Sequence, residues 1–273
     1  MELRVDHVDF GYGGDALTLH DISFTLDRPG LTCIIGPNGV GKSTLIKCIN
    51  RLLKPVSGTV TVDGRDVQTM SLKELSEFMG YVPANSRDCF SMPVVENIMM
   101  GCRRRSRWRT DREDLEDAYR IMRLLDLEGL AMRGSNELSA GQHQRVSLAR
   151  GIVSYPKILI LDEPTSNLDV QQQVYVTELL RALAMDMGMM VLMISHDLNI
   201  SAKYADTIIV MSKPGVVYGI GSPEEVITRE TIRNVYGVDC TIIDDHRRPH
   251  VVLGFTIPND ERDSGSARLI SDA

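Results

Sequence analysis

The chain has 273 residues, 43% of them hydrophobic and 25% charged, which is the composition of an ordinary soluble globular protein with one large domain or two small ones. Its formal net charge of −7 argues against non-specific nucleic-acid binding, because such binding depends on Lys and Arg neutralising phosphates. The first residues include Glu2, Arg4 and Asp6, unlike a signal peptide, and the longest apolar stretch, 187–194, is far short of the ~20 residues that span a bilayer. We therefore expect a cytosolic protein that meets a membrane only through a partner.

Short apolar strands alternate with helices along most of the chain. In chain order, hydrophobic periodicity and turn residues predict a strand at 3–10, a strand at 31–35, a helix at 45–53, a strand at 58–64, a helix after a capping box at Ser71 and Glu74, a helix at 111–127, a strand at 158–161, a helix at 170–184, a strand at 189–194 and a closing pair of strands at 206–211 and 216–220. This alternation indicates an α/β domain with a mostly parallel sheet.

The region from about 85 to 155 differs from the rest because it is rich in helical pattern and shows no clear strand. We interpret it as a helical insertion within a single domain over 1–255. In the helix at 111–127 the expected apolar stripe consists of Leu115, Ala118, Tyr119, Met122 and Leu125. The segment 256–273 is polar and lacks periodicity, so we expect a mobile tail.

The number of cysteines is odd, and no two of them form a C-x-x-C pair. They are Cys33, Cys48, Cys89, Cys102 and Cys240. We expect reduced thiols rather than disulfides or a zinc site.

One stretch matches the phosphate-loop pattern G-x-x-x-x-G-K-[ST] at every fixed position, between a predicted buried strand and a helix. Its glycines allow backbone N–H groups to turn inward around phosphate oxygens. The positive N-terminal end of the following helix also attracts the phosphate. We expect Lys42 to reach the β- and γ-phosphates and the Ser43 hydroxyl to bind Mg²⁺. The predicted ATP-binding residues here are Gly36, Pro37, Asn38, Gly39, Val40, Gly41, Lys42, Ser43 and Thr44.

Two later strands end in residues that can take part in phosphate chemistry. The strand at 158–161 delivers Asp162 and Glu163 at its carboxyl end, where ligands of parallel sheets bind. We expect Asp162 to hold the Mg²⁺ shell and Glu163 to polarise the attacking water. His196 follows the strand at 189–194 and could contact the transferred phosphate and orient the water, although a lone His at a strand end is more often structural.

Together with the run LSAGQ, these motifs resemble those of the ATP-binding cassette (ABC) ATPases. The phosphate loop, LSAGQ at 138–142, ILILDEP at 158–164, SNLD at 166–169 and His196 occur in the order and spacing of that family, over roughly residues 2–255. The resemblance implies a phosphate-loop NTPase core with a mostly parallel sheet, an N-terminal antiparallel β portion and a helical insertion that carries the signature motif. It also implies ATP and Mg²⁺ as cofactors and hydrolysis of ATP to ADP and phosphate, coupled to transport.

In this family two cassettes pack head to tail, and each signature closes over the ATP held by the opposite phosphate loop. The resemblance therefore implies a dimer of two copies. The signature residues are Leu138, Ser139, Ala140, Gly141 and Gln142. Asp169 matches the loop that crosses between the cassettes, and Tyr12 stands where the family has an aromatic residue that stacks on adenine; the alternative is an ordinary turn tyrosine.

One position departs from the family. The usual Gln that contacts Mg²⁺ and water is replaced by Ala84, followed by Asn85. Either Asn85 or water substitutes, or coupling is altered, so a cassette that binds ATP and switches conformation but hydrolyses it weakly is an alternative to an efficient ATPase.

The spacing and number of the motifs exclude two classes of cassette protein. Lys42 and Ser139 are 97 residues apart, which leaves no room for the long coiled coil that DNA-acting cassettes insert between these motifs. Translation-factor cassettes carry two cassettes per chain, whereas this chain holds one. We expect a transporter subunit, peripheral on the cytoplasmic face of the membrane, that serves separate permease chains and indirectly a substrate-binding protein. The stretch 221–254 resembles subunits of iron-siderophore, haem and cobalamin importers; another importer or an exporter is the alternative.

A basic run lies within the predicted insertion, from Arg103 to Arg109. It could be a solvated face beside the acidic helix that follows, a nucleic-acid contact, or a contact with the permease close to an anionic membrane leaflet. We favour the permease contact, because an anionic leaflet would attract arginine.

Overall fold

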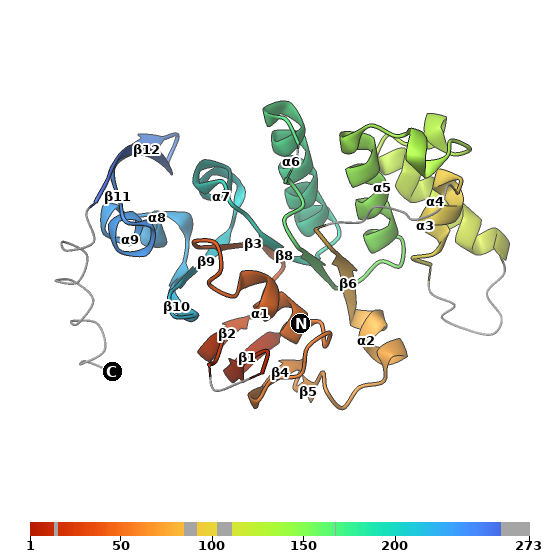
Figure 1. Ribbon diagram of the computed structural model, residues 1–273. Helices are drawn as coiled ribbons and strands as arrows, with labels where there is room; N and C mark the ends of the chain where they lie inside the picture. Colours follow the sequence, from red (N-terminus) through yellow and green to blue (C-terminus); the bar gives the residue numbers. More distant parts are fainter. Residues whose placement is uncertain (14–15, 85–91, 103–110, 167, 258–273) are drawn as a thin grey trace. The chain divides into compact units, whose positions relative to one another are not determined.

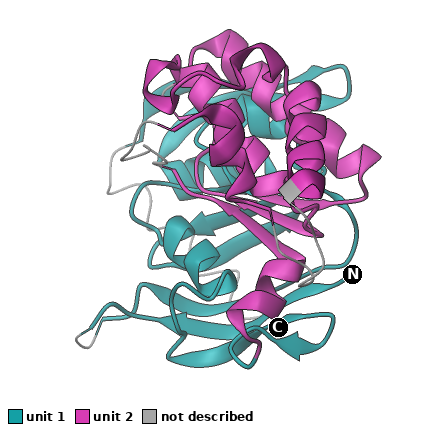
Figure 2. Cartoon of the chain, turned by 90° about the vertical axis from the view of Figure 1, so that its right-hand side faces the viewer, with its two compact units in different colours: residues 1–69, 193–273 teal, residues 70–192 magenta. Residues whose placement is uncertain are grey.

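The computed structural model describes residues 1–13, 16–84, 92–102, 111–166 and 168–257 of the chain (Figure 1). The chain divides into two compact units. Unit 1 comprises residues 1–69 and 193–273, and unit 2 comprises residues 70–192; Figure 2 colours them separately. None of the described helices is long and apolar enough to cross a membrane.

Unit 1 begins with an antiparallel sheet whose strand order is β2-β1-β4-β5. Its strands are β1 (Leu3–Phe10), β2 (Leu19–Leu26), β4 (Ser57–Val62) and β5 (Arg65–Asp66). In β1 and β2 buried residues alternate with exposed ones, as expected of a sheet with one solvated face. The family's N-terminal antiparallel β portion is therefore confirmed.

A second group of strands in unit 1 carries the phosphate loop. The strands β3 (Gly30–Ile35) and β9 (Thr207–Ser212) pair in parallel, and β10 (Val216–Gly221) pairs antiparallel with β9. Every residue of β3 is buried, so the strand shows no polar alternation. The helix α1 (Lys42–Ile49) follows β3 after six residues, an arrangement that places a loop at the carboxyl end of the strand.

The last elements of unit 1 form a C-terminal group: α7 (Leu198–Tyr204), α8 (Pro223–Val226), α9 (Arg229–Thr231), η3 (Ile232–Tyr236) and the hairpin of β11 (Val238–Asp245) and β12 (Arg248–Thr256). The side-chain amide of Asn199 on α7 exchanges two hydrogen bonds with the backbone of Val251, at 2.7 and 3.2 Å. These bonds fix the hairpin on α7. Ile257, just after β12, is also buried, and the rest of the expected tail lies outside the described residues.

Unit 2 combines a short parallel strand pair with a group of helices. The strands β6 (Met79–Val82) and β7 (Ile158–Leu161) are parallel, and β8 (Met190–Ile194) begins in this unit and ends in unit 1. The helices are α2 (Leu72–Phe78), α3 (Val94–Met99), α4 (Asp111–Leu124), η1 (Glu128–Leu130), η2 (Ser135–Glu137), α5 (Ala140–Ile152) and α6 (Val170–Asp186). Between β6 and β7 the described residues form helices and no named strand, as the predicted insertion requires.

Helix α4 shows one error in the predicted apolar stripe. Ala118 and Met122 are fully buried, as is Leu125 just after the helix ends, and Tyr119 is half-buried, but 38% of Leu115 is exposed. The buried face of this helix instead includes Ile121, which is only 1% exposed to solvent. The stripe is therefore shifted around the helix by the packing of its neighbours, which hydrophobic spacing alone does not determine.

The predicted thiols agree with the structure where it describes them. Among the described residues Cys33, Cys48, Cys102 and Cys240 form no disulfide, and Cys89 lies outside the described residues. Burial raises the pKa of both Cys33 and Cys48 to about 12, so these thiols stay protonated at neutral pH.

Candidate functional site

The phosphate loop in unit 1 depends on glycine at two positions. Gly36, Gly39 and Gly41 all have positive φ, at 149°, 79° and 93°. A Cβ on Gly36 would lie 2.3 Å from the carbonyl oxygen of Met211, and one on Gly41 would lie 2.6 Å from Leu19 Cδ2. Side chains at Gly36 and Gly41 are therefore excluded both by conformation and by space.

The lysine of the loop is held against the loop's own backbone. Lys42 is 5% exposed, and its Nζ donates hydrogen bonds to the carbonyl oxygens of Gly36 and Pro37, at 2.7 and 2.9 Å. These two carbonyl oxygens hold the ammonium in place. The loop thus combines inward-turned backbone, a helix N-terminus and a fixed positive charge, which together favour a phosphate.

Tyr12 lies beside this loop with most of its ring uncovered. Its hydroxyl hydrogen-bonds Thr44 Oγ1 of α1 at 3.0 Å, and its ring meets that of Phe10 edge-on, with centroids 5.0 Å apart. Even so, 66% of Tyr12 is exposed. A flat aromatic surface fixed next to a phosphate loop suits stacking on a base, which supports the predicted adenine contact.

His196 belongs to the same part of unit 1. It is exposed and follows Ser195, whose backbone N–H donates to the carbonyl oxygen of Ile34 at 3.1 Å. Ile34 lies two residues before Gly36 in the chain. The hydrogen bond therefore places the backbone before His196 at the carboxyl end of β3, where the phosphate loop begins.

Asp162 and Glu163 follow β7 in unit 2. The N–H of Asp162 donates to the carbonyl oxygen of Val82 at 2.9 Å, and the residue is 6% exposed. Glu163 has a φ of 52°, which is unusual for a residue with a side chain, and its carbonyl oxygen accepts hydrogen bonds from the backbone and the hydroxyl of Ser166, at 3.1 and 2.9 Å. Strained backbone of this kind is common at catalytic positions.

Tyr81 on β6 was not predicted as part of this site. Burial, and secondly the charge of Asp162, raises its pKa to about 12. Because the charge of Asp162 affects Tyr81, the neutral phenol of Tyr81 lies close to Asp162, the predicted metal ligand. A tyrosine within a short strand gives no sequence signal that distinguishes it from core.

The signature run forms the start of α5. Ser139 is the N-cap, its side chain accepts from the N–H of Gln142 at 3.3 Å, and the Gln142 side chain accepts from the N–H of Ser139 at 3.0 Å. This is a capping box, and α5 begins directly after Ser139. A Cβ on Gly141 would lie 2.7 Å from Gln172 Oε1, so that side chain of α6 approaches the bare backbone closely.

A cavity of about 310 Å³ lies in front of this helix start. Its lining residues, all in unit 2, are Ser139, Ala140, Gly141, Gln142, Arg145, Leu168, Asp169 and Gln172. The structure thus brings Asp169 together with four of the five signature residues, while Leu138 stands just before the helix and does not line the cavity. Asp169 also caps α6, since its Oδ1 accepts from Gln172 N–H at 2.9 Å. Arg145 and Gln172 are lining residues that the sequence motifs did not indicate.

Some predicted features fall on parts of the chain that the structure does not describe. These are Asn85, the run from Arg103 to Arg109 and Asn167. Ala84 is described: it is partly buried and lies two residues after β6. Because β6 and β7 are parallel, with Val82 opposite Leu161, Ala84 follows β6 at the same sheet edge at which Asp162 follows β7.

Comparison with known proteins places the chain in one family. Residues 19–166 match the ABC transporter family model. An uncharacterized ABC transporter ATP-binding protein of Methanocaldococcus jannaschii, MJ0089, is 39% identical, over 92% of this chain and 98% of its own length. The hemin import ATP-binding protein HmuV of Escherichia coli O157:H7 is 38% identical, over 85% and 92% of the two chains. The phosphonates import ATP-binding protein PhnC of Nitratidesulfovibrio vulgaris is 35% identical, over 86% and 91%.

A solved structure agrees with these sequence relatives. The ATP-binding cassette MJ0796, in a dimeric post-hydrolysis state with bound ADP and phosphate, superposes with a TM-score of 0.72 at 27% identity, over 81% of this chain and 98% of that one. The predicted α/β fold and the resemblance to cassette ATPases are confirmed. The chain belongs to the ABC transporter family, as an ATP-binding subunit whose class hydrolyses ATP to drive transport.

Proposed function

We propose that this chain drives a membrane importer by hydrolysing ATP between two copies of itself. The observation that carries the proposal is the cavity lined by Ser139, Gly141 and Asp169. The hydrogen bonds of Lys42 to Gly36 and of Tyr12 to Thr44, at the phosphate loop, support it further. None of the residues that line this cavity belongs to the phosphate loop. In the proposed dimer, this cavity would receive the ATP that the phosphate loop of the second copy holds.

ATP would bind with its adenine on Tyr12 and its phosphates in the loop of residues 36–44. The Ser43 hydroxyl and the Asp162 carboxylate would hold Mg²⁺, and both are the hard oxygen donors that this ion prefers. The ion would neutralise charge on the phosphates when bound. Lys42 would then move its ammonium from the loop carbonyls toward the β- and γ-phosphate oxygens, since these carry more negative charge.

Glu163 would accept the proton of the attacking water, and His196 would contact the γ-phosphate and orient that water. The exposed position of His196 at the end of β3 supports contact with a bound phosphate. The left-handed backbone of Glu163, with two hydrogen bonds to its carbonyl oxygen, supports a side chain held in one direction.

The second copy would complete each site with its own signature. Ser139 Oγ and the first N–H groups of α5 would bind the far γ-phosphate, favoured by the positive end of that helix. The dimeric state of the related cassette MJ0796 with ADP and phosphate supports this arrangement.

Transport would require separate permease chains, and indirectly a substrate-binding protein, with this subunit peripheral on the cytoplasmic face. The hemin import relative supports haem, one of the three substrate classes, with iron-siderophores and cobalamin, that the C-terminal sequence suggested. The phosphonates import relative is nearly as similar, so transport assays should compare haem with a phosphonate. Preferential uptake of the phosphonate would overturn the substrate class and leave the ATPase proposal intact.

The ATPase proposal is tested by phosphate release from the subunit reconstituted with its permease. Lys42→Ala should weaken nucleotide binding, whereas Glu163→Gln should keep ATP binding and lose at least about 100-fold in turnover, because it retains the shape of the side chain and removes the base. Glu77→Gln, at an exposed position on α2, is the matched control and should behave as wild type. Wild-type turnover by Glu163→Gln would contradict the role of Glu163.

A switch cassette with weak hydrolysis is the second candidate, and Ala84 is the observation in its favour. A methyl group at the sheet edge of Asp162 cannot contact the metal or the water, so basal turnover should be slow. Ala84→Gln should raise turnover, measured by phosphate release with and without permease. Equal turnover of wild type and Ala84→Gln, both with and without permease, would show that this position has no catalytic role.

A further inference from the structure

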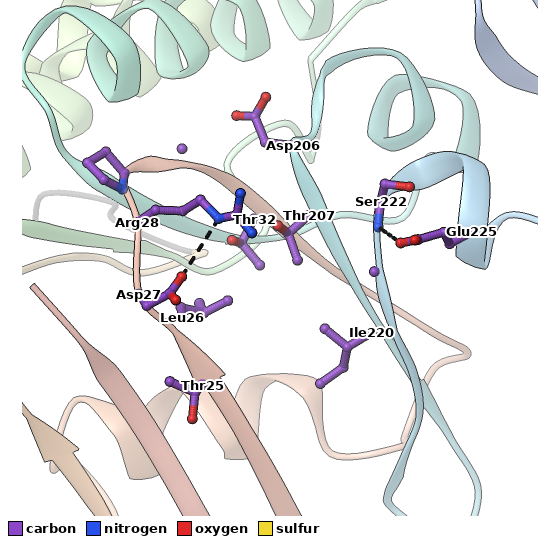
Figure 3. Close-up of a pocket in the computed structure, with 13 residues that line it drawn as sticks. Thr25, Leu26, Asp27, Arg28, Thr32, Asp206, Thr207, Ile220, Ser222 and Glu225 are labelled. Atoms are coloured by element: carbon purple, nitrogen blue, oxygen red, sulfur yellow. Dashed lines mark hydrogen bonds and ion pairs between the residues drawn. The ribbon is translucent and has the colours of Figure 1, made fainter.

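A second cavity, of about 370 Å³, lies in unit 1 at the amino ends of β3 and β9 (Figure 3). Its residues come from the end of β2, the turn into β3, the start of β9 and the segment from β10 to α8. They are Thr25, Leu26, Asp27, Arg28, Pro29, Gly30, Thr32, Asp206, Thr207, Ile220, Gly221, Ser222 and Glu225. Its volume falls in the range of sites for small molecules.

Two hydroxyl groups in this cavity have no protein partner. Thr32 is 95% buried, at 5% exposure, and is directly opposite Thr207 in the parallel pair of β3 and β9. Within the described part of the chain, no protein group hydrogen-bonds either hydroxyl. Thr207 is half-buried. A buried hydroxyl is normally satisfied, so that of Thr32, next to the Thr207 hydroxyl on the wall of the cavity, points to a ligand with hydrogen-bonding groups.

Carboxylates dominate the charge around this cavity. Figure 3 shows Asp27, Asp206 and Glu225 around the open space, each from a different segment. The backbone fixes two of them: Asp206 Oδ2 accepts from Leu31 N–H at 2.9 Å, and Glu225 Oε2 accepts from Ser222 N–H at 2.7 Å. Fixed carboxylates of this kind are suited to a cation and oppose an anion.

The other charges do not reverse this preference. Arg28 Nε lies 3.7 Å from Asp27 Oδ1, and 88% of the arginine side chain is exposed, so its charge is shared with Asp27 at the surface. Among the described residues no group of three His, Cys, Asp or Glu side chains is arranged to hold a metal ion. A bare metal is therefore a poorer match than an organic cation, which brings N–H donors on a carbon frame.

The cavity also has an apolar part, formed by Leu26, Pro29 and Ile220. In Figure 3 Leu26 lies next to Asp27 and Ile220 lies across the open space from it, both away from Asp206. We propose that this cavity binds a short aliphatic diamine, whose ammonium groups pair with Asp206 and Glu225, whose N–H groups donate to the hydroxyls of Thr32 and Thr207, and whose methylenes contact Leu26 and Ile220.

This site is separate from the phosphate loop but built on the same strands. Thr32 is near the start of β3 and Gly36 follows its end, while Met211, near the end of β9, packs against Gly36. The diamine and ATP therefore bind at opposite ends of these strands and can be bound together. The proposal does not depend on the proposed transport function.

Calorimetric titration of the full-length chain with putrescine tests the proposal. Putrescine should bind, and its neutral and anionic analogues, 1,4-butanediol and succinate, should bind at least about tenfold more weakly, because they lack the ammonium groups. Thr32→Val removes only the hydroxyl, and Glu225→Gln removes the charge while keeping a residue that suits a capping box. Each should weaken putrescine binding by about tenfold.

Two controls separate this site from the rest of the surface. Glu224→Gln, also on α8 but not in the cavity, and Lys42→Ala, in the phosphate loop, should leave putrescine binding unchanged. If Thr32→Val does not fold, Thr207→Val replaces it. Absence of putrescine binding at about 10 mM, equal binding of succinate, or equal binding by the wild type and the Thr→Val and Glu225→Gln variants would overturn the proposal, since each contradicts recognition by fixed carboxylates and hydroxyls.

Discussion

Tyr12 combines a fixed hydroxyl with an exposed ring, and these two properties have different physical consequences. The hydrogen bond to Thr44 contributes to local order on the phosphate loop, whereas the exposed ring surface is available to a ligand. The Tyr12 ring is not isolated at the surface, because Phe10 contacts it edge-on. The two properties can be separated by mutation.

Tyr12→Ala should weaken ATP binding by about tenfold, because stacking of a base on an aromatic ring is worth about 1–3 kcal/mol. Tyr12→Phe keeps the ring and loses only the hydroxyl, so it should change ATP affinity less than about threefold. Titration with a fluorescent ATP analogue labelled on the ribose measures both. If Tyr12→Phe weakened binding as much as Tyr12→Ala, the hydroxyl rather than stacking would account for the effect.

At the scale of elements, the sequence predicted the buried strands that carry the motifs and missed several others, among them the C-terminal hairpin. The runs at 31–35, 158–161 and 189–194 are continuous and apolar, and each is a buried strand in the structure. The hairpin of β11 and β12 was missed because its two-residue turn is His246-Arg247, with φ of 55° and 67°. Turns of that geometry are usually marked by Asn-Gly or Asp-Gly.

The sequence also predicted only part of the candidate site. The motif residues are close in sequence to a strand end or a helix start, so local pattern identifies them. Tyr81, Arg145 and Gln172 contribute only because other elements pack next to them. Contacts that depend on packing between distant segments have no period or turn residue to mark them.

Helix α5 permits a test of whether Ser139 does more than cap a helix. Ser71 forms the same capping box at the start of α2, with Glu74. Ser139→Ala and Ser71→Ala should each lower the free energy of unfolding by about 1 kcal/mol, measured by urea denaturation. Only Ser139→Ala should also reduce ATP turnover, by about tenfold, because it loses a hydrogen bond to the far γ-phosphate.

Turnover of the two serine variants decides between the two roles of Ser139. If both kept the wild-type rate of phosphate release at saturating ATP, Ser139 would be a helix cap and nothing more. If both lost turnover equally, the loss would follow from stability.

At the scale of the whole molecule, the two units divide the predicted machinery. Unit 1 carries Tyr12, the phosphate loop and His196, and unit 2 carries Asp162, Glu163 and the signature. The signature and Asp169 line a cavity of their own. A reaction that uses all of these groups needs both units, and the account further requires a second copy of the chain to supply the signature.

The central claim is that ATP joins two copies of this chain, and the most direct measurement is the molar mass of Glu163→Gln by gel filtration with light scattering. This variant should bind ATP without consuming it, so with saturating ATP and Mg²⁺ it should elute with the mass of two chains. With ADP it should elute as one chain, because the γ-phosphate that the far signature binds is missing. A variant that binds ATP yet remains a single chain at saturating ATP and Mg²⁺ would contradict the account.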